Sequence, residues 1–183
     1  MPHTHYTTLI SAANLAERLA AAPGSVALFD CRFDLVDPDA SEAAYAAGHI
    51  AGAQYLHLDR DLSGRKTGTN GRHPLPTRDA LATLLASRGL KQGQQVVAYD
   101  AQGGAYAARL WWLLRWLGHD SVAVLDGGLQ AWQAAGQPLT SKASPTRTTS
   151  ARRTAQPSCR RNSPSRTRKR SKRTRSRTPS RAG

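Results

Sequence analysis

The sequence predicts an α/β domain in which a parallel β-sheet carries helices on both faces, followed by a disordered basic tail. Short apolar runs that suit buried strands alternate along the chain with helical patterns, as in proteins built from parallel strands. The composition changes abruptly near residue 141, beyond which Asp, Glu and every large apolar residue are absent. We therefore divide the chain into a domain over residues 1–140 and a tail rich in Arg, Ser, Thr and Pro over residues 141–183.

The expected strands are short and apolar. Residues 26–29 read Val-Ala-Leu-Phe, and residues 95–99 read Gln-Val-Val-Ala-Tyr. Continuous apolar runs of this length are typical of strands that are buried on both faces. The predicted strands cover residues 26–29, 53–56, 95–99 and 121–125.

The expected helices begin at capping residues and end near glycines. Ser11 and Thr77 each precede a helical pattern, and a hydroxyl oxygen at this position accepts a hydrogen bond from an N–H of the first turn. The helix before Gly118 is so apolar that we expect core packing of its tryptophans and of the one in the last helix: Trp111, Trp112, Trp116 and Trp132. The predicted helices cover residues 11–22, 41–47, 77–88, 105–117 and 128–136.

The net positive charge of the chain lies in its tail. Residues 1–140 hold 11 Lys and Arg against 12 Asp and Glu, whereas the tail holds 15 Lys and Arg and no acid. A domain that is basic as a whole and binds nucleic acid is therefore excluded. Because the apolar runs are short, we also expect no membrane span and no secretory signal. Two cysteines make no disulfide framework, so we expect a cytoplasmic protein.

Three segments carry a resemblance to a known family. They are Asp-Cys-Arg-Phe-Asp-Leu over 30–35, Tyr-Ala-Ala-Gly-His-Ile-Ala-Gly-Ala over 45–53, and a third that runs from Val96 to Trp132 through Asp100. In this order and spacing they resemble a rhodanese domain over about residues 8–140. The resemblance is best to the N-terminal half of two-domain thiosulfate and 3-mercaptopyruvate sulfurtransferases. Ala51 departs from the family pattern, which usually has proline there, and this change loosens one turn.

The resemblance implies persulfide chemistry without a cofactor. A cysteine thiolate takes a sulfane sulfur from a small donor such as thiosulfate and passes it to a thiophilic acceptor. Here Asp100 occupies the position of the nucleophile, and a carboxylate carries no transferable sulfur. The N-terminal domain of such proteins is commonly the non-catalytic one, so we expect this chain to be inactive alone and to lack a second rhodanese domain. Cys31 is a weak alternative nucleophile.

Other candidate residues concern surfaces and metals. The resemblance implies that Arg32, Phe33 and Arg109 line a substrate or domain interface. We expect no metal site, although His3 and His5 form a pair that could hold a metal weakly. An apolar face that a second domain would cover predicts self-association of the chain.

The tail leaves three interpretations open. It is a basic arm that binds nucleic acid through charge alone, a frameshift product read in the wrong frame, or a fused localisation signal. For the whole chain, the first function is therefore a sulfurtransferase-family domain that depends on a catalytic partner domain. The alternatives are an inactive binding or regulatory module and a nucleic-acid binder that acts through the tail.

Overall fold

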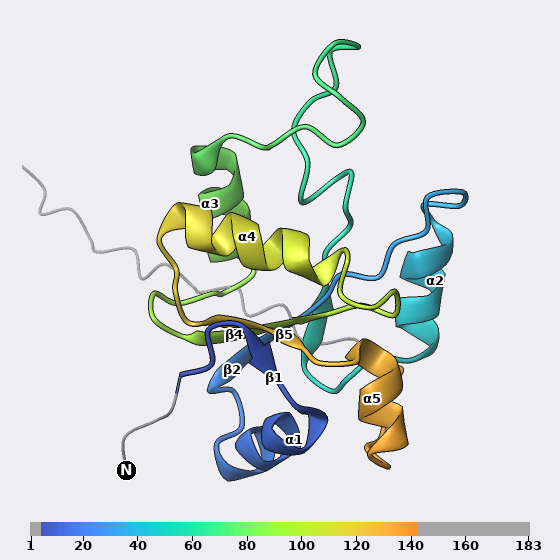
Figure 1. Cartoon of the computed structure of the whole chain (residues 1–183), viewed down its shortest axis with the longest axis vertical. Helices are drawn as coiled ribbons and strands as arrows, with labels where there is room; N and C mark the ends of the chain where they lie inside the picture. The colour runs from blue at the N-terminus through green and yellow to red at the C-terminus, as the bar shows by residue number, and fades with distance from the viewer. Residues whose placement is uncertain (1–4, 143–183) are drawn as a thin grey trace, which may run out of the picture. The chain divides into compact units, whose positions relative to one another are not determined.

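Five parallel strands form one sheet within residues 5–142, which the computed structural model describes (Figure 1). Their order across the sheet is β1-β5-β4-β2-β3, so β4 lies in the centre. Since all neighbouring strands run in the same direction, their carboxyl ends share one edge of the sheet. The strands are β1 (Leu9–Ile10), β2 (Val26–Asp30), β3 (Ala53–Tyr55), β4 (Gln95–Tyr99) and β5 (Val122–Leu125).

Side chains of β4 alternate between two apolar clusters, one on each face of the sheet. Val96 and Ala98 pack in the cluster beneath α3 and α4, whereas Val97 and Tyr99 pack in the cluster beneath α1 and α5. Successive residues of a strand point to opposite faces, so a strand buried on both faces must be apolar throughout. The helices are α1 (Ala12–Ala21), α2 (Ala40–Ala47), α3 (Arg78–Ser87), α4 (Ala107–Leu117) and α5 (Gly128–Ala134).

The expected α/β class is confirmed, and the predicted elements are present. Ser11 and Thr77 cap α1 and α3, and their side chains accept hydrogen bonds from the N–H groups of Asn14 and Ala80. Helix α4 starts at Ala107, two residues later than predicted, because the residues before it form a turn around Asp100. Strand β1 was not predicted, since two residues are too short to show a period.

The prediction that all four tryptophans pack in the core is wrong for one of them. Trp132 is buried, and Trp111 and Trp116 are half-buried against the core. Trp112 is 45% exposed and stacks on Trp116, with their ring centroids 5.8 Å apart. Residues four apart share a face of a helix, so Trp112 stacks on Trp116, whereas Leu113 of the same helix fills the core.

Two further observations bear on the predictions about the chain as a whole. Within the described range, no helix combines the length and the apolar character that a membrane crossing requires. The predictions for the tail concern residues that, from 143 onward, lie outside the described part of the chain.

Candidate functional site

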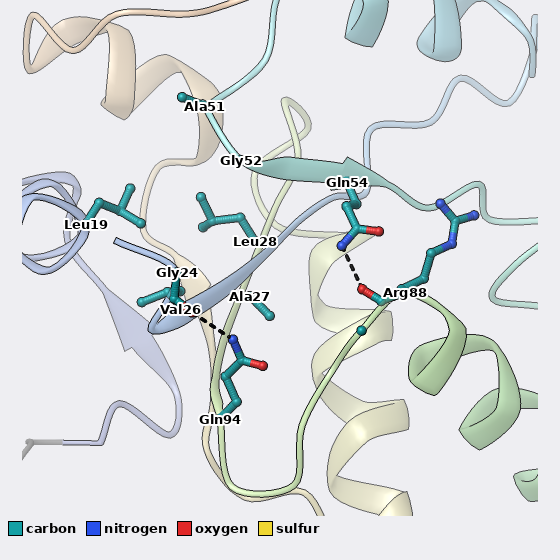
Figure 2. Close-up of a pocket in the computed structure, with 11 residues that line it drawn as sticks. Leu19, Gly24, Val26, Ala27, Leu28, Ala51, Gly52, Gln54, Arg88 and Gln94 are labelled. Carbon is teal, nitrogen blue, oxygen red and sulfur yellow. Dashed lines mark hydrogen bonds between the residues drawn. The ribbon is translucent and has the colours of Figure 1, made fainter. Parts of the chain in front are cut away.

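A pocket of about 240 Å³ lies at the amino-terminal end of β2, away from the carboxyl edge of the sheet (Figure 2). The side-chain amide of Gln54 donates to the carbonyl of Arg88 across this pocket, and Gln94 donates to the carbonyl of Gly24. These bonds tie the loops before β2 and β4 to the rest of the fold. No residue predicted for the site lines this pocket.

Asp100, which directly follows β4, is the centre of the opposite edge. Its side chain is fully buried, and both carboxylate oxygens accept hydrogen bonds from the turn that leads into α4. The donors are the backbone N–H groups of Gln102 at 2.9 Å and Gly104 at 2.8 Å to Oδ1, and those of Tyr106 at 2.9 Å and Ala107 at 2.9 Å to Oδ2. Charge-assisted bonds of this kind offset the desolvation of a buried carboxylate.

The backbone of Asp100 is held from a second direction. Its carbonyl accepts a hydrogen bond of 2.8 Å from the N–H of Leu129. Gly128 approaches so closely that a Cβ there would lie 2.5 Å from the same carbonyl oxygen, and its φ of +59° also favours glycine. The turn after β4 is therefore fixed by β4, α4 and the start of α5 together.

The arrangement of donors around Asp100 suits an anion. Backbone N–H groups converge at the amino-terminal end of α4, where the helix dipole adds favourable potential for negative charge. In this chain the anion is the side chain of Asp100 itself. The cradle is thus filled from within, by a group that has no sulfur to transfer.

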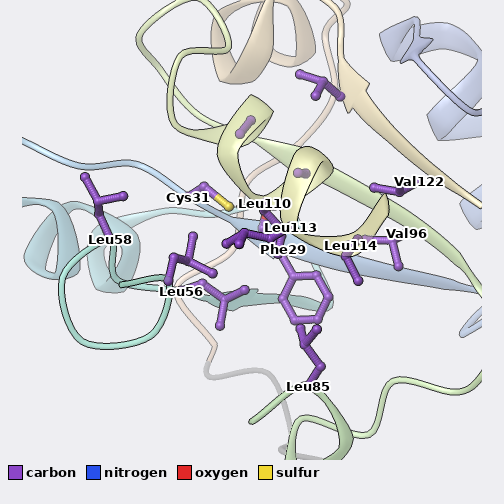
Figure 3. Packing of buried hydrophobic residues seen from close by; sticks show 14 of the residues in the cluster. Phe29, Cys31, Leu56, Leu58, Leu85, Val96, Leu110, Leu113, Leu114 and Val122 are labelled. Atoms are coloured by element: carbon purple, nitrogen blue, oxygen red, sulfur yellow. Dashed lines mark hydrogen bonds between the residues drawn. The ribbon is translucent and has the colours of Figure 1, made fainter. Parts of the chain in front are cut away.

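Cys31 is the other candidate nucleophile, and the structure buries it in the apolar core. Figure 3 shows its sulfur among the side chains of this cluster, on the side of α4 that carries Leu110. Burial raises the pKa of the Cys31 thiol well above its ordinary value, and the charges of Asp30 and Asp100 raise it further. A protonated thiol with no exposure is a poor nucleophile.

Arg32 is buried in an ion pair at the carboxyl end of β2. Its guanidinium donates from Nε at 3.0 Å and from Nη2 at 2.7 Å to Asp30, and Nη2 also donates to the carbonyl of Gly48 at 2.8 Å. Burial works to lower the pKa of Arg32, but the hydrogen bond and charge of Asp30 raise it. Arg32 therefore joins the end of β2 to the end of α2, and it is not an exposed cation.

Phe33, predicted for the same surface as Arg32, is fully buried. Its ring packs edge-on against three aromatic rings, with centroid distances of 5.1 Å to His57, 6.0 Å to His73 and 5.6 Å to Tyr106. Tyr106 belongs to the cradle of Asp100. Phe33 therefore connects that cradle to the histidines of the long loop between β3 and α3.

The structure shows an Asp–His pair in that loop that the sequence did not indicate. His73 Nδ1 lies 2.9 Å from Asp59 Oδ1, and Lys66 Nζ lies 3.0 Å from the same oxygen. Although burial works in the other direction, the hydrogen bonds from Lys66 and His73 lower the pKa of Asp59. Within the described residues, the buried His73 Nε2 has no hydrogen-bond partner.

Arg109, the third residue predicted for the interface, points from α4 into the same loop. It is half-buried, and it donates to backbone carbonyls on both sides of the loop, so it is not an exposed cation either. Across residues 5–142, no group of three His, Cys, Asp or Glu side chains is placed to hold a metal ion. His3 of the expected pair lies outside that range.

The fold and the site together define an α/β domain with an anion cradle at the carboxyl end of its central strand. The profile of the Rhodanese-like domain family matches residues 11–135, and the chain belongs to that family. The chain is 50% identical over 134 residues to a probable 3-mercaptopyruvate sulfurtransferase of Pseudomonas aeruginosa, and the match covers 72% of this chain and 46% of that protein.

Solved structures agree with this assignment. The 3-mercaptopyruvate sulfurtransferase of Leishmania major superposes with a TM-score of 0.69 at 30% identity, over 78% of this chain and 38% of that one. SseA from Escherichia coli, a 3-mercaptopyruvate sulfotransferase by its title, superposes with a TM-score of 0.65 at 29% identity, over 75% and 52%. The domain is thus homologous to thiosulfate and 3-mercaptopyruvate sulfurtransferases, and the chain spans about half the length of these curated relatives.

Proposed function

We propose that this chain is the non-catalytic, N-terminal-type domain of a thiosulfate or 3-mercaptopyruvate sulfurtransferase. Sulfur transfer then depends on a second domain that supplies a cysteine. The observation that carries the proposal is the buried carboxylate of Asp100, which fills the anion cradle with four backbone N–H donors. The half-length match to sulfurtransferases supports it.

The chemistry of the whole protein follows from a thiolate in that second domain. With thiosulfate as the donor, the thiolate bonds to the outer sulfur, the S–S bond breaks, and sulfite leaves with the electron pair. The persulfide then passes its outer sulfur to a thiophilic acceptor, which regenerates the thiolate. The present chain contributes no sulfur atom to either step.

The loops at the carboxyl edge support contact with a second domain. Leu35, Val36 and Leu75 are 44%, 95% and 51% exposed, and all three belong to loops at this edge. The guanidinium of Arg72 donates to the carbonyl of Leu35 at 3.0 Å and so joins the two loops. We call these three apolar residues the edge patch. Arg32 and Phe33 are buried in the segment that leads from β2 toward Leu35.

The Asp59–His73 pair is the group that this domain would offer to the reaction. Asp59 holds the imidazole through Nδ1, and in the described part of the chain Nε2 is buried without a hydrogen-bond partner. An imidazole held in this way can take or give a proton at Nε2. In the proposed two-domain protein, His73 would act beside the sulfur-carrying cysteine of the other domain.

The first test is activity of the chain alone. With thiosulfate or 3-mercaptopyruvate as donor and cyanide as acceptor, we expect no thiocyanate above the uncatalysed background. Mass spectrometry after incubation with the donor should show no sulfur added at Cys31, and a Cys31→Ser variant should behave identically. Catalytic turnover by the wild-type chain would contradict the proposal, and its loss in Cys31→Ser would assign it to that thiol.

The second test is the mass of the natural protein. A product substantially heavier than 19.7 kDa is expected, because the proposal requires a second domain. A natural product of 19.7 kDa would favour the alternative, a rhodanese-like module that binds a partner without turnover. The buried free thiol of Cys31 suits a reducing compartment, so a cytoplasmic location is part of the proposal.

The exposed indole of Trp112 is the observation that favours this alternative. It stacks on Trp116, whose other neighbour is the guanidinium of Arg78 at 5.1 Å. Aromatic side chains in exposed positions are typical of interaction surfaces. A binding module predicts a stable complex of the natural protein that Trp112→Ala disrupts while the fold is retained.

A further inference from the structure

The side chain of Arg109 joins the two ends of the long loop between β3 and α3. We call the place where these ends meet the neck of the loop. Its Nε donates to the carbonyl of Leu62 at 3.0 Å, where the loop leaves the core. Its Nη2 donates to the carbonyls of His73 at 3.0 Å and Pro74 at 3.1 Å, where the loop returns. One guanidinium therefore ties together two segments that lie more than ten residues apart in the sequence.

This guanidinium has only neutral acceptors. In the described part of the chain, no carboxylate lies within ion-pair distance of Arg109, and burial lowers the pKa of Arg109. A half-buried cation without a counter-ion loses hydration that neutral carbonyls restore only in part. The arrangement thus costs free energy, and its benefit is a fixed position of the loop backbone.

The contacts at the neck fix the position of the backbone at His73. Pro74 accepts a second hydrogen bond of 2.9 Å from the N–H of Gly64. A Cβ at Gly64 would lie 2.5 Å from the carbonyl oxygen of Leu75, so the two sides of the neck are in direct contact. Arg109 and Gly64 thereby fix the residues that carry the imidazole from two sides.

We propose that Arg109 is a positioning residue for His73. It fixes the backbone at the neck so that the imidazole meets Asp59 through Nδ1 and Nε2 stays buried. This inference rests on the proposed function for its meaning, but the geometry that it asserts belongs to this chain alone. A lysine cannot replace Arg109, because an ammonium group lacks the planar fork that reaches both sides of the neck.

The test is nuclear magnetic resonance of the full chain. Arg109→Lys is compared with Arg115→Lys, which changes an exposed residue on the same helix whose ion pair with Asp120 spans 3.9 Å. We expect Arg109→Lys to shift and broaden the ring nitrogen signals of His73 and to speed amide exchange across residues 64–74 by about tenfold, the equivalent of one or two hydrogen bonds. Arg115→Lys should leave both readouts unchanged.

A second variant separates positioning from stability. In Arg109→Ala, added methylguanidinium should return the His73 ring signals toward their wild-type positions. Wild-type ring signals and wild-type loop exchange in folded Arg109→Lys would overturn the proposal. Global unfolding of both variants would overturn it as well, because Arg109 would then be a general stabilising residue.

The result of this experiment does not depend on whether the proposed function is correct. Unchanged His73 signals would remove the positioning role and leave the sulfur-transfer proposal in place. Thiocyanate formation by the chain alone would remove that proposal and leave the measured link between Arg109 and His73 intact.

Discussion

At the scale of single residues, the carboxylate of Asp100 does two kinds of work. It satisfies four backbone N–H groups at the start of α4 and in the preceding turn, of which that of Ala107 is buried. It also places a negative charge where an anionic donor would have to bind, so the same contact that stabilises the turn keeps such a donor out. The stability of the turn and the inactivity that we propose for this position would therefore have one cause.

Replacement of Asp100 by alanine should destabilise the chain strongly. The change leaves buried N–H donors without partners, and we expect the free energy of unfolding to fall by about 3 kcal/mol or more. Urea denaturation measures the difference. Asp120→Ala, at a side chain that is 77% exposed, is the matched control and should stay within about 0.5 kcal/mol of the wild type. Equal effects of the two variants would show that the cradle contributes little.

The lowered pKa of Asp59 predicts that the stability of the folded chain depends on pH. Burial raises its pKa, but the hydrogen bonds from Lys66 and His73 outweigh that effect and lower it in the folded state. The folded chain therefore favours the carboxylate. This contribution is complete above the unfolded pKa of about 3.9 and is lost as the pH falls through the lower folded pKa. Urea denaturation of wild type and Asp59→Asn should show a difference that shrinks below about pH 4. A difference that stays constant with pH would rule out this contribution.

At the scale of elements, the strands and helices could be predicted from the sequence, whereas the Asp–His pair could not. The period of apolar residues and the capping residues Ser11 and Thr77 are local signals, and the helices that they predicted are present. Asp100 could be recognised because it directly follows an apolar strand. Asp59 and His73 lie 14 residues apart in an irregular loop, where no period relates one side chain to another. The exposure of Trp112 was missed because a helix that is apolar on every side does not reveal which face the core takes.

The junction between β4 and α5 gives a prediction at this scale. Gly128→Ala places a Cβ against the carbonyl of Asp100 and also strains a positive φ, whereas Gly118→Ala strains a positive φ with no atom within 4 Å. Gly118→Ala should therefore cost about 1 kcal/mol, the backbone contribution alone. Gly128→Ala should cost clearly more, since a contact of 2.5 Å forces the turn to move. Thermal or urea unfolding of the two variants gives the comparison, and equal costs would mean that the turn yields freely.

At the scale of the whole molecule, the edge patch determines how the isolated chain behaves. Leu35, Val36 and Leu75 expose apolar surface on loops that Arg72 joins. Exposed apolar groups gain free energy when they leave water, whether against a second domain or against another copy. An interface that is complete in a two-domain protein is therefore a site of association when this domain is alone.

We expect the chain to self-associate at high concentration in sedimentation velocity experiments. A Val36→Ser variant should shift the distribution toward the monomer, because Val36 is 95% exposed and contributes the most open apolar side chain of the edge patch. Leu9→Ser, at a residue 54% exposed on the edge strand β1 and outside the edge patch, is the control and should have no effect. A clean monomer of the wild-type chain at every concentration would contradict the expectation.

The central position of β4 bears on how slowly its amide hydrogens exchange with solvent. Its five residues are buried, it pairs with β2 and β5, and it leads directly into the turn around Asp100. Amide hydrogens in such a strand exchange with solvent only when most of the domain opens. Gln95–Tyr99 should thus be the last segment to take up deuterium, while the loop that carries His73 exchanges early. The domain would then keep its cradle closed through fluctuations that open its loops.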